Sequence, residues 1–199
     1  MQHLTEIPEE VILELEEIIH APERPVGSVG ENPFEYYLSE EYLNTLTLID
    51  AAKFSKLSLI TRQAYKENLP HISGFLKDLK YQISGNLSGN FHYPEDGFMS
   101  WHTNFKRKDY RVYFSKREPG EKTSYFRYKQ NGEIITSLDP EGWSARLFNV
   151  GDEQNPFWHC VYGGSGRYSV GFRLAPFEDK ETSREPEILA QNSLGIDRT

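Results

Sequence analysis

The stretch WHCVYGGSGRYSVGFRL, residues 158–174, contains two β-prone runs separated by a glycine-rich turn. In the second run Arg167, Ser169, Gly171 and Arg173 alternate with aromatic and aliphatic side chains. Successive side chains of a strand point to opposite faces, so the apolar set can pack on an outer layer while the polar set faces an interior. The alternation predicts a strand that turns two guanidinium groups inward.

Further β-prone runs precede this stretch from residue 84 onward, separated by turn-forming segments. The runs are RVYFSK, SYFRYK, EIITSL and SARLFNV, followed by FWHCVY, which overlaps the start of the quoted stretch. The separators include REPGEK, QNG, DPEG and GDEQNP. We interpret DPEG, residues 139–142, as a turn, and GGSG, residues 163–166, as a hairpin turn rather than a phosphate cradle. Many short strands at this spacing predict a sandwich, jelly roll or barrel.

The first 83 residues have a different character, because their apolar residues recur at helical spacing. Pro8 suits a first helical turn, and residues 34–83 continue the helical spacing with breaks near Pro70 and Gly74. We therefore expect one domain that is mainly β with an α-helical N-terminal support. Its parts are a helical region at 1–83, a jelly-roll core at 84–175 and a charged C-terminal tail at 176–199.

Composition narrows the class of partner. The net charge of −8 over 199 residues argues against a nucleic acid or an anionic membrane held by bulk electrostatics, despite the basic segment KRKDYR at 106–111. No apolar run approaches the ~20 residues that span a bilayer, and the N-terminus lacks signal-peptide character. The single cysteine, Cys160, excludes an internal disulfide framework and is expected to be a small core residue. These features favour a cytoplasmic protein.

Two of the six histidines, His102 and His159, occur in matching settings in the β-rich part. Each follows a tryptophan, and a jelly roll can bring two such strands side by side. Imidazole is a common metal ligand, so the pair is a candidate metal site. The alternative interpretation is that each Trp-His dipeptide is a core aromatic residue beside a hydrogen-bonded neighbour.

Two further features bear on this candidate site. Asn104 lies two residues after His102, where a carboxylate would supply part of the facial triad typical of non-haem iron(II). An inward arginine requires an anionic partner, and the planar guanidinium suits a carboxylate bound through two hydrogen bonds. Gly171 would leave room for such a ligand beside the strand.

The segment HCVYGGSGRYS resembles the C-terminal signature of the iron(II)/2-oxoglutarate-dependent dioxygenases, particularly the prolyl-hydroxylase type. The segment around His102 resembles the H-x-D/E motif of the same family. GFMSWHTN, FWHCVY and GFRL are also similar to small oxygenase-like proteins encoded by bacteriophages. The resemblance covers about residues 85–175 and implies a double-stranded β-helix, or jelly roll, buttressed by helices.

The resemblance also implies roles for individual residues. His102 and His159 would bind iron(II), with Asn104 or water at the third position. Arg167 would hold the distal carboxylate of 2-oxoglutarate, supported by Ser169 or Tyr113. The expected cosubstrate-lining residues are Arg111, Tyr113, Arg167, Ser169 and Arg173, where Arg173 is either the alternative clamp or the partner of an acidic residue.

The departure at Asn104 leaves three alternatives. The amide oxygen or a water completes the metal site, as in the aspartyl/asparaginyl β-hydroxylase branch, which works with two histidines and no carboxylate. Otherwise Asp96 or Asp109 supplies a third ligand, or the site is inactive and the fold serves binding.

The sequence therefore supports a hydroxylase dependent on iron(II) and 2-oxoglutarate, with Trp101, Trp158 and Tyr93 at the pocket rim. Its substrate would be a protein side chain, a nucleobase or a small molecule. One alternative is a catalytically inactive jelly roll with a structural or interaction role, in a virus particle or with a protein partner on the tail. Another is a cupin-like small-molecule binder without oxygen chemistry. A viral protein would act in the host cytoplasm or the virion.

Overall fold

The structure is a computed structural model that describes residues 1–20, 23–48, 58–63, 68–85, 88–104 and 109–177. Residues 178–199 of the expected tail and residues 106–108 of the basic segment at 106–111 lie outside these residues. Within the described part of the chain, no helix is long and apolar enough to cross a bilayer.

Eight antiparallel strands form two facing sheets. The strands are β5 (Gly89–Tyr93), β6 (Phe98–His102), β7 (Tyr110–Arg117), β8 (Tyr125–Gln130), β9 (Glu133–Leu138), β10 (Gly142–Asn149), β11 (His159–Tyr162) and β12 (Arg167–Pro176). One sheet has the order β10-β7-β12-β5 and the other the order β6-β11-β8-β9. Apart from the β8–β9 hairpin, successive strands belong to opposite sheets, which confirms the predicted jelly roll.

The N-terminal region supplies helices and also strands. Its elements are β1 (Gln2–Leu4), α1 (Glu9–Ile19), β2 (Glu23–Val26), α2 (Phe34–Tyr37), α3 (Glu40–Thr45), β3 (Ser58–Gln63), α5 (Pro70–Asp78) and β4 (Tyr81–Ile83). The expectation of a purely helical region is therefore wrong at these four strands. β3 pairs with both β5 and β6, so it joins the two sheets along one side.

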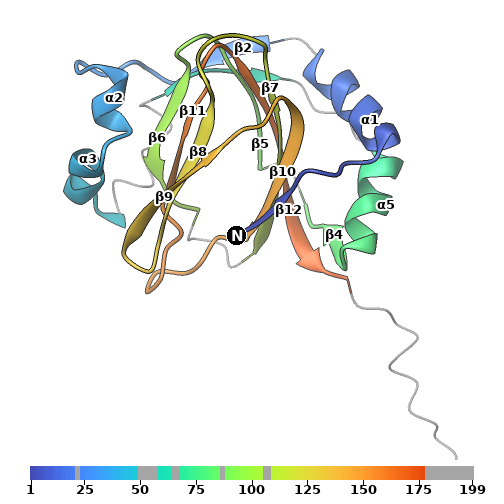
Figure 1. The fold of residues 1–199 in the computed structure, drawn as a ribbon. Coiled ribbons are helices and arrows are strands. Elements are labelled where there is room, and N and C mark those ends of the chain that lie inside the picture. The colour runs from blue at the N-terminus through green and yellow to red at the C-terminus, as the bar shows by residue number, and fades with distance from the viewer. Residues whose placement is uncertain (21–22, 49–57, 64–67, 86–87, 105–108, 178–199) are drawn as a thin grey trace, which may run out of the picture.

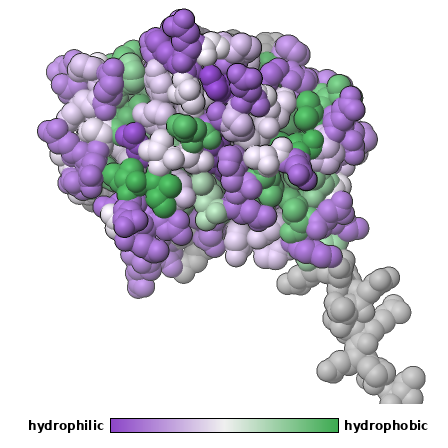
Figure 2. Space-filling model, in the orientation of Figure 1, coloured by the Kyte–Doolittle hydropathy of each residue, from purple (hydrophilic) through white to green (hydrophobic). Residues whose placement is uncertain are grey.

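Helices cover the outer faces of both sheets (Figure 1). Helices α1 and α5 pack on the sheet that contains β7, β10 and β12, where Leu15 and Leu76 belong to the same buried cluster as Phe114 and Phe172. Helices α2 and α3 cover the other sheet. On the face shown in Figure 2, hydrophobic residues form separate small patches among hydrophilic ones.

The alternation predicted for β12 is confirmed. Val170, Phe172 and Leu174 are buried in the cluster that includes α1 and α5, while Arg167 and Ser169 are buried on the opposite side of the strand. The GGSG segment is a turn, but it does not close a hairpin. It connects β11, which pairs with β6 and β8, to β12, which pairs with β5 and β7 in the other sheet.

Candidate metal and anion site

The structure brings His102 and His159 together inside the barrel. They are cross-strand partners at the end of β6 and the start of β11, and their ring centroids lie 4.0 Å apart. Both side chains are buried, with relative exposures of 3% and 1%. The convergence expected from the matching Trp-His settings is therefore present.

A β-bulge in β6 turns His102 inward. His102 pairs with His159 and Met99 pairs with Val161, so β6 uses three residues where β11 uses two. In a regular strand Met99 and His102 would point to opposite faces. The extra residue places both on the interior side and leaves Trp101 in the outer cluster against α2 and α3.

Backbone carbonyls fix the tautomer of both rings. Nδ1 of His102 lies 2.8 Å from the Ser100 carbonyl oxygen, and Nδ1 of His159 lies 3.2 Å from that of Phe157. A carbonyl oxygen only accepts hydrogen bonds, so each neutral ring carries its hydrogen on Nδ1 and has its lone pair on Nε2. This is the arrangement in which metal-ligating histidines are usually held. Nε2 of His159 is buried and has no hydrogen-bond partner among the described residues.

Both rings are neutral at physiological pH. Burial lowers the pKa of His102 to about 4, against the opposing effect of the Ser100 carbonyl. Burial also holds the pKa of His159 well below its usual value, and the neighbouring His102 and Arg111 lower it further. Two neutral imidazoles are suited to bind a divalent transition metal because they need not lose a proton first.

The described residues do not supply a carboxylate to this pair. They contain no cluster of three His, Cys, Asp or Glu side chains placed to hold a metal ion. Asp96 accepts hydrogen bonds from Lys122 and Tyr162. Asp109 pairs with Arg111 and Arg173 instead. Both carboxylates of the alternative third ligand therefore have other partners in this structure.

Asn104 follows the end of β6 and is half-buried. Its Nδ2 atom is buried and has no hydrogen-bond partner among the described residues. The side-chain amide is thus not satisfied by this part of the protein. Its assignment as a metal ligand stays a prediction.

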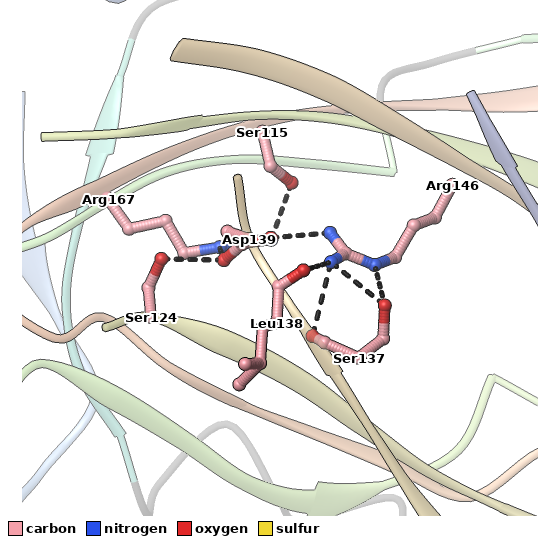
Figure 3. Close-up of polar contacts among 7 residues, drawn as sticks. All are labelled: Ser115, Ser124, Ser137, Leu138, Asp139, Arg146 and Arg167. Atoms are coloured by element: carbon pink, nitrogen blue, oxygen red, sulfur yellow. Dashed lines mark hydrogen bonds and ion pairs between the residues drawn. The ribbon is translucent and has the colours of Figure 1, made fainter. Parts of the chain in front are cut away.

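Arg167 is fully buried at the start of β12, and its anionic partner is a residue of the chain itself. Its Nε donates to Asp139 Oδ2 at 2.9 Å and its Nη2 to Ser115 Oγ at 2.5 Å. Arg146 contacts the other carboxylate oxygen, Oδ1, at 2.5 Å. Figure 3 shows the Asp139 carboxylate between the two guanidinium groups. Nη1 of Arg167 has no hydrogen-bond partner among the described residues.

Asp139 and Arg146 are the residues that the sequence did not identify. The interpretation of DPEG as only a turn is wrong, because its aspartate is buried and accepts hydrogen bonds from Arg146, Arg167 and Ser124. Burial alone would raise the pKa of Asp139, but the two arginines and the Ser124 hydroxyl lower it to about 2. Arg146 could have indicated this buried carboxylate from the sequence. It lies two residues before Phe148 on the inward face of β10 and therefore also requires an anion.

A second cluster with two arginines lies on the same sheet. Arg111 and Arg173 are cross-strand partners on β7 and β12. Each donates its Nε to one oxygen of Asp109, at 2.8 and 2.9 Å. Arg173 thus partners an acidic residue, one of the two roles expected for it. Between the residues that the structure describes, both arginines bond to Asp109 through Nε and not through their terminal nitrogens.

Tyr113 fills the space expected beside Gly171. A Cβ atom at Gly171 would lie 2.5 Å from the Tyr113 ring, so the expected room for a ligand is taken by an aromatic side chain. Tyr113 also lies near the pair, 6.4 Å from the His159 ring. Of the expected rim residues, Trp101 and Tyr93 are buried in the core and are not at a rim. Trp158 does line a pocket.

Comparison with known proteins gives a distant structural likeness only. No protein-family model matches the chain, and no curated protein matches it. The fold is similar to the crystal structure of a prolyl-4-hydroxylase from Pseudomonas putida, with a TM-score of 0.41 and 9% sequence identity. The likeness covers 84% of this chain and 99% of that one.

Proposed function

We propose that the protein is an oxygenase dependent on iron(II) and 2-oxoglutarate, and that it hydroxylates its substrate. The observation that carries this proposal is the pair His102–His159. Two neutral imidazoles are in contact inside a jelly roll, and both hold their Nδ1 hydrogen on a backbone carbonyl. Imidazole suits iron(II), and Asn104 or water would complete the coordination. When bound, iron(II) supplies the activation of oxygen that is coupled to conversion of 2-oxoglutarate to succinate.

The charge of the barrel interior supports a dianionic cosubstrate. Its two clusters contain four arginines, Arg111, Arg146, Arg167 and Arg173, but only two carboxylates, Asp109 and Asp139. The formal charge of these six groups is therefore positive by two. Buried charges without counter-charges are costly, so a dicarboxylate of charge −2 would offset the imbalance. Nη1 of Arg167, which has no hydrogen-bond partner in the described part of the chain, is one donor for it.

A second function, a catalytically inactive jelly roll with an interaction role, also has a specific observation in its favour. Asp139 already pairs with Arg167, so the inward arginine does not require an external anion. The His pair also lacks a carboxylate among the described residues. This alternative predicts a stable protein that neither binds iron(II) nor forms succinate.

Metal binding separates the two functions. We expect the purified protein to bind one equivalent of iron(II) under anaerobic conditions, measured by titration. Replacement of His159 by alanine should weaken binding by at least ~100-fold, because even the loss of an outer partner of a metal ligand costs 10–100-fold. Since burial lowers the pKa of both histidines, binding should persist as the pH falls below 6.5.

His71→Ala is the matched control, because this histidine is exposed on α5 and should leave the affinity unchanged. A wild-type protein that binds no iron(II), or an unaffected His159→Ala variant, would rule out the metal site. Succinate formation from 2-oxoglutarate in the iron-loaded protein then tests the oxygenase itself.

Replacement of Asn104 by aspartate should tighten iron(II) binding, because a carboxylate adds a negative charge to a neutral donor set. The measurement is the same anaerobic titration of both proteins. Equal affinities would show that position 104 is outside the coordination sphere and that water completes the site.

A further inference from the structure

A pocket of about 640 Å³ lies at the end of the barrel that contains the histidine pair. Its walls are the β8–β9 turn, the end of β10 and the loop that leads into β11. Phe157 and Trp158, which immediately precede His159, line it. This volume lies within the ~300–1,000 Å³ typical of small-ligand sites.

Carboxamide side chains are the largest group among the lining residues. They are Gln130, Asn131, Asn149, Gln154 and Asn155. Asn149 is used internally, since its Oδ1 accepts the Gly151 N–H at 2.8 Å. The other four make no side-chain hydrogen bond within the part of the chain that the structure describes. Each carboxamide offers both donors and an acceptor without a net charge.

The charges around the pocket disfavour an ionic ligand. Lys129 is the one cation among the described lining residues, and no Asp or Glu is among them. Three acidic residues lie close to lining residues along the chain. Glu133 pairs with Gln130 across the β8–β9 turn, and Asp152 and Glu153 lie in the loop after β10. These three carboxylates outnumber the single lysine, which disfavours a phosphate backbone as the occupant.

We infer that this pocket binds a neutral saccharide. Sugar rings present dense hydroxyl groups, each both donor and acceptor, which match carboxamides, and their C–H faces match the aromatic surface of Phe157 and Trp158. A peptide added to the sheet edge would lie along β9, whereas the pocket is bounded by a turn and a loop. The inference does not depend on the metal site.

Calorimetric titration of the full chain, in the presence of a chelator, tests the inference. The probes are maltohexaose, cellohexaose and chitohexaose, three neutral oligosaccharides with different linkages and substituents. We expect saturable binding of at least one at one site per chain. The variant Asn131→Gly/Gln154→Ala removes two carboxamides, and glycine tolerates the positive φ of 53° at residue 131.

The double variant should bind about 25-fold more weakly, since a neutral hydrogen bond is worth about five-fold in affinity. Asn44→Ala, at an exposed carboxamide on α3 outside the pocket, is the matched control and should bind like the wild type. The absence of saturable binding with all three probes would overturn the inference. Equal affinity of the double variant, or preferential binding of an Asn/Gln-rich peptide, would overturn it too.

Discussion

Replacement of Asp139 by asparagine is expected to lower the free energy of unfolding by about 3–5 kcal/mol, the cost of breaking a buried ion pair by removing one partner. Asp139 is the one carboxylate between Arg146 and Arg167, and all three side chains are almost completely buried. Asparagine keeps the size of the side chain and some hydrogen bonding but leaves two guanidinium groups without a counter-charge. Urea unfolding followed by fluorescence measures the loss.

Asp96→Asn is the matched control. Asp96 also has two partners, Lys122 and Tyr162, but the ion pair with Lys122 is exposed, so its loss should cost no more than about 1 kcal/mol. Asparagine also tolerates the positive φ of 57° at this position. Equal losses in the two variants would mean that the buried cluster contributes no more to stability than a surface ion pair.

The same carboxylate predicts a specific acid response. Folding lowers the pKa of Asp139 from 3.8 to about 2. A carboxyl with a lowered pKa contributes stability that is present above its unfolded pKa and is lost as pH falls through its folded pKa. The difference in stability between the wild type and Asp139→Asn should therefore narrow as pH falls from 4 to 2.

Replacement of Arg167 by methionine is expected to abolish formation of succinate from 2-oxoglutarate while leaving iron(II) binding intact. This prediction rests on the proposed function, in which Nη1 of Arg167 donates to the cosubstrate carboxylate. Methionine fills a similar volume without charge. A loss of activity would therefore come from the missing guanidinium group and not from a loss of packing. Single-turnover succinate production and iron(II) titration measure the two properties.

Arg146→Met is the matched variant for this experiment. It also leaves Asp139 with one arginine, so both variants should lose similar stability. Only Arg167→Met should lose succinate formation. If Arg173→Ala abolishes it and Arg167→Met does not, the cosubstrate is held by the Arg111–Arg173 cluster. If neither Arg167→Met nor Arg173→Ala loses succinate formation, both assignments of the cosubstrate site are contradicted.

Local patterns in the sequence predicted much of this architecture. The alternation in β12 determined which side chains face the interior, because strand geometry allows only two faces. Turn-forming segments marked the connections, and the helical spacing of apolar residues after Pro8 marked α1. The matching settings of His102 and His159 were enough to predict their convergence, although the bulge that turns His102 inward leaves no signal in the local pattern.

The missed features depend on contacts between distant segments. The apolar spacing of the sequence placed β3 in a helical region, but the pairing of this segment with β5 and β6 determines its conformation. Asp139 occurs in a sequence typical of an exposed turn, and its burial follows from two arginines on other strands. Gly171 suggested an empty space, whereas the Tyr113 ring from the neighbouring strand occupies it. A single sequence does not reveal which distant side chain fills such a gap.

The pairing of β1 with β10 affects how the chain can fold as it is synthesised. Gln2 lies opposite Leu147, and Glu16 of α1 accepts hydrogen bonds from Lys116 and Trp143. The partners that β1 and α1 have on β10 are therefore absent until residues 142–149 have been made, whereas α5 is available to α1 earlier. Contacts between such distant segments slow folding and prolong the exposure of apolar surface. Nascent chains stalled before residue 142 should consequently be cleaved by proteases in β1 and α1 more readily than chains that extend well past β12.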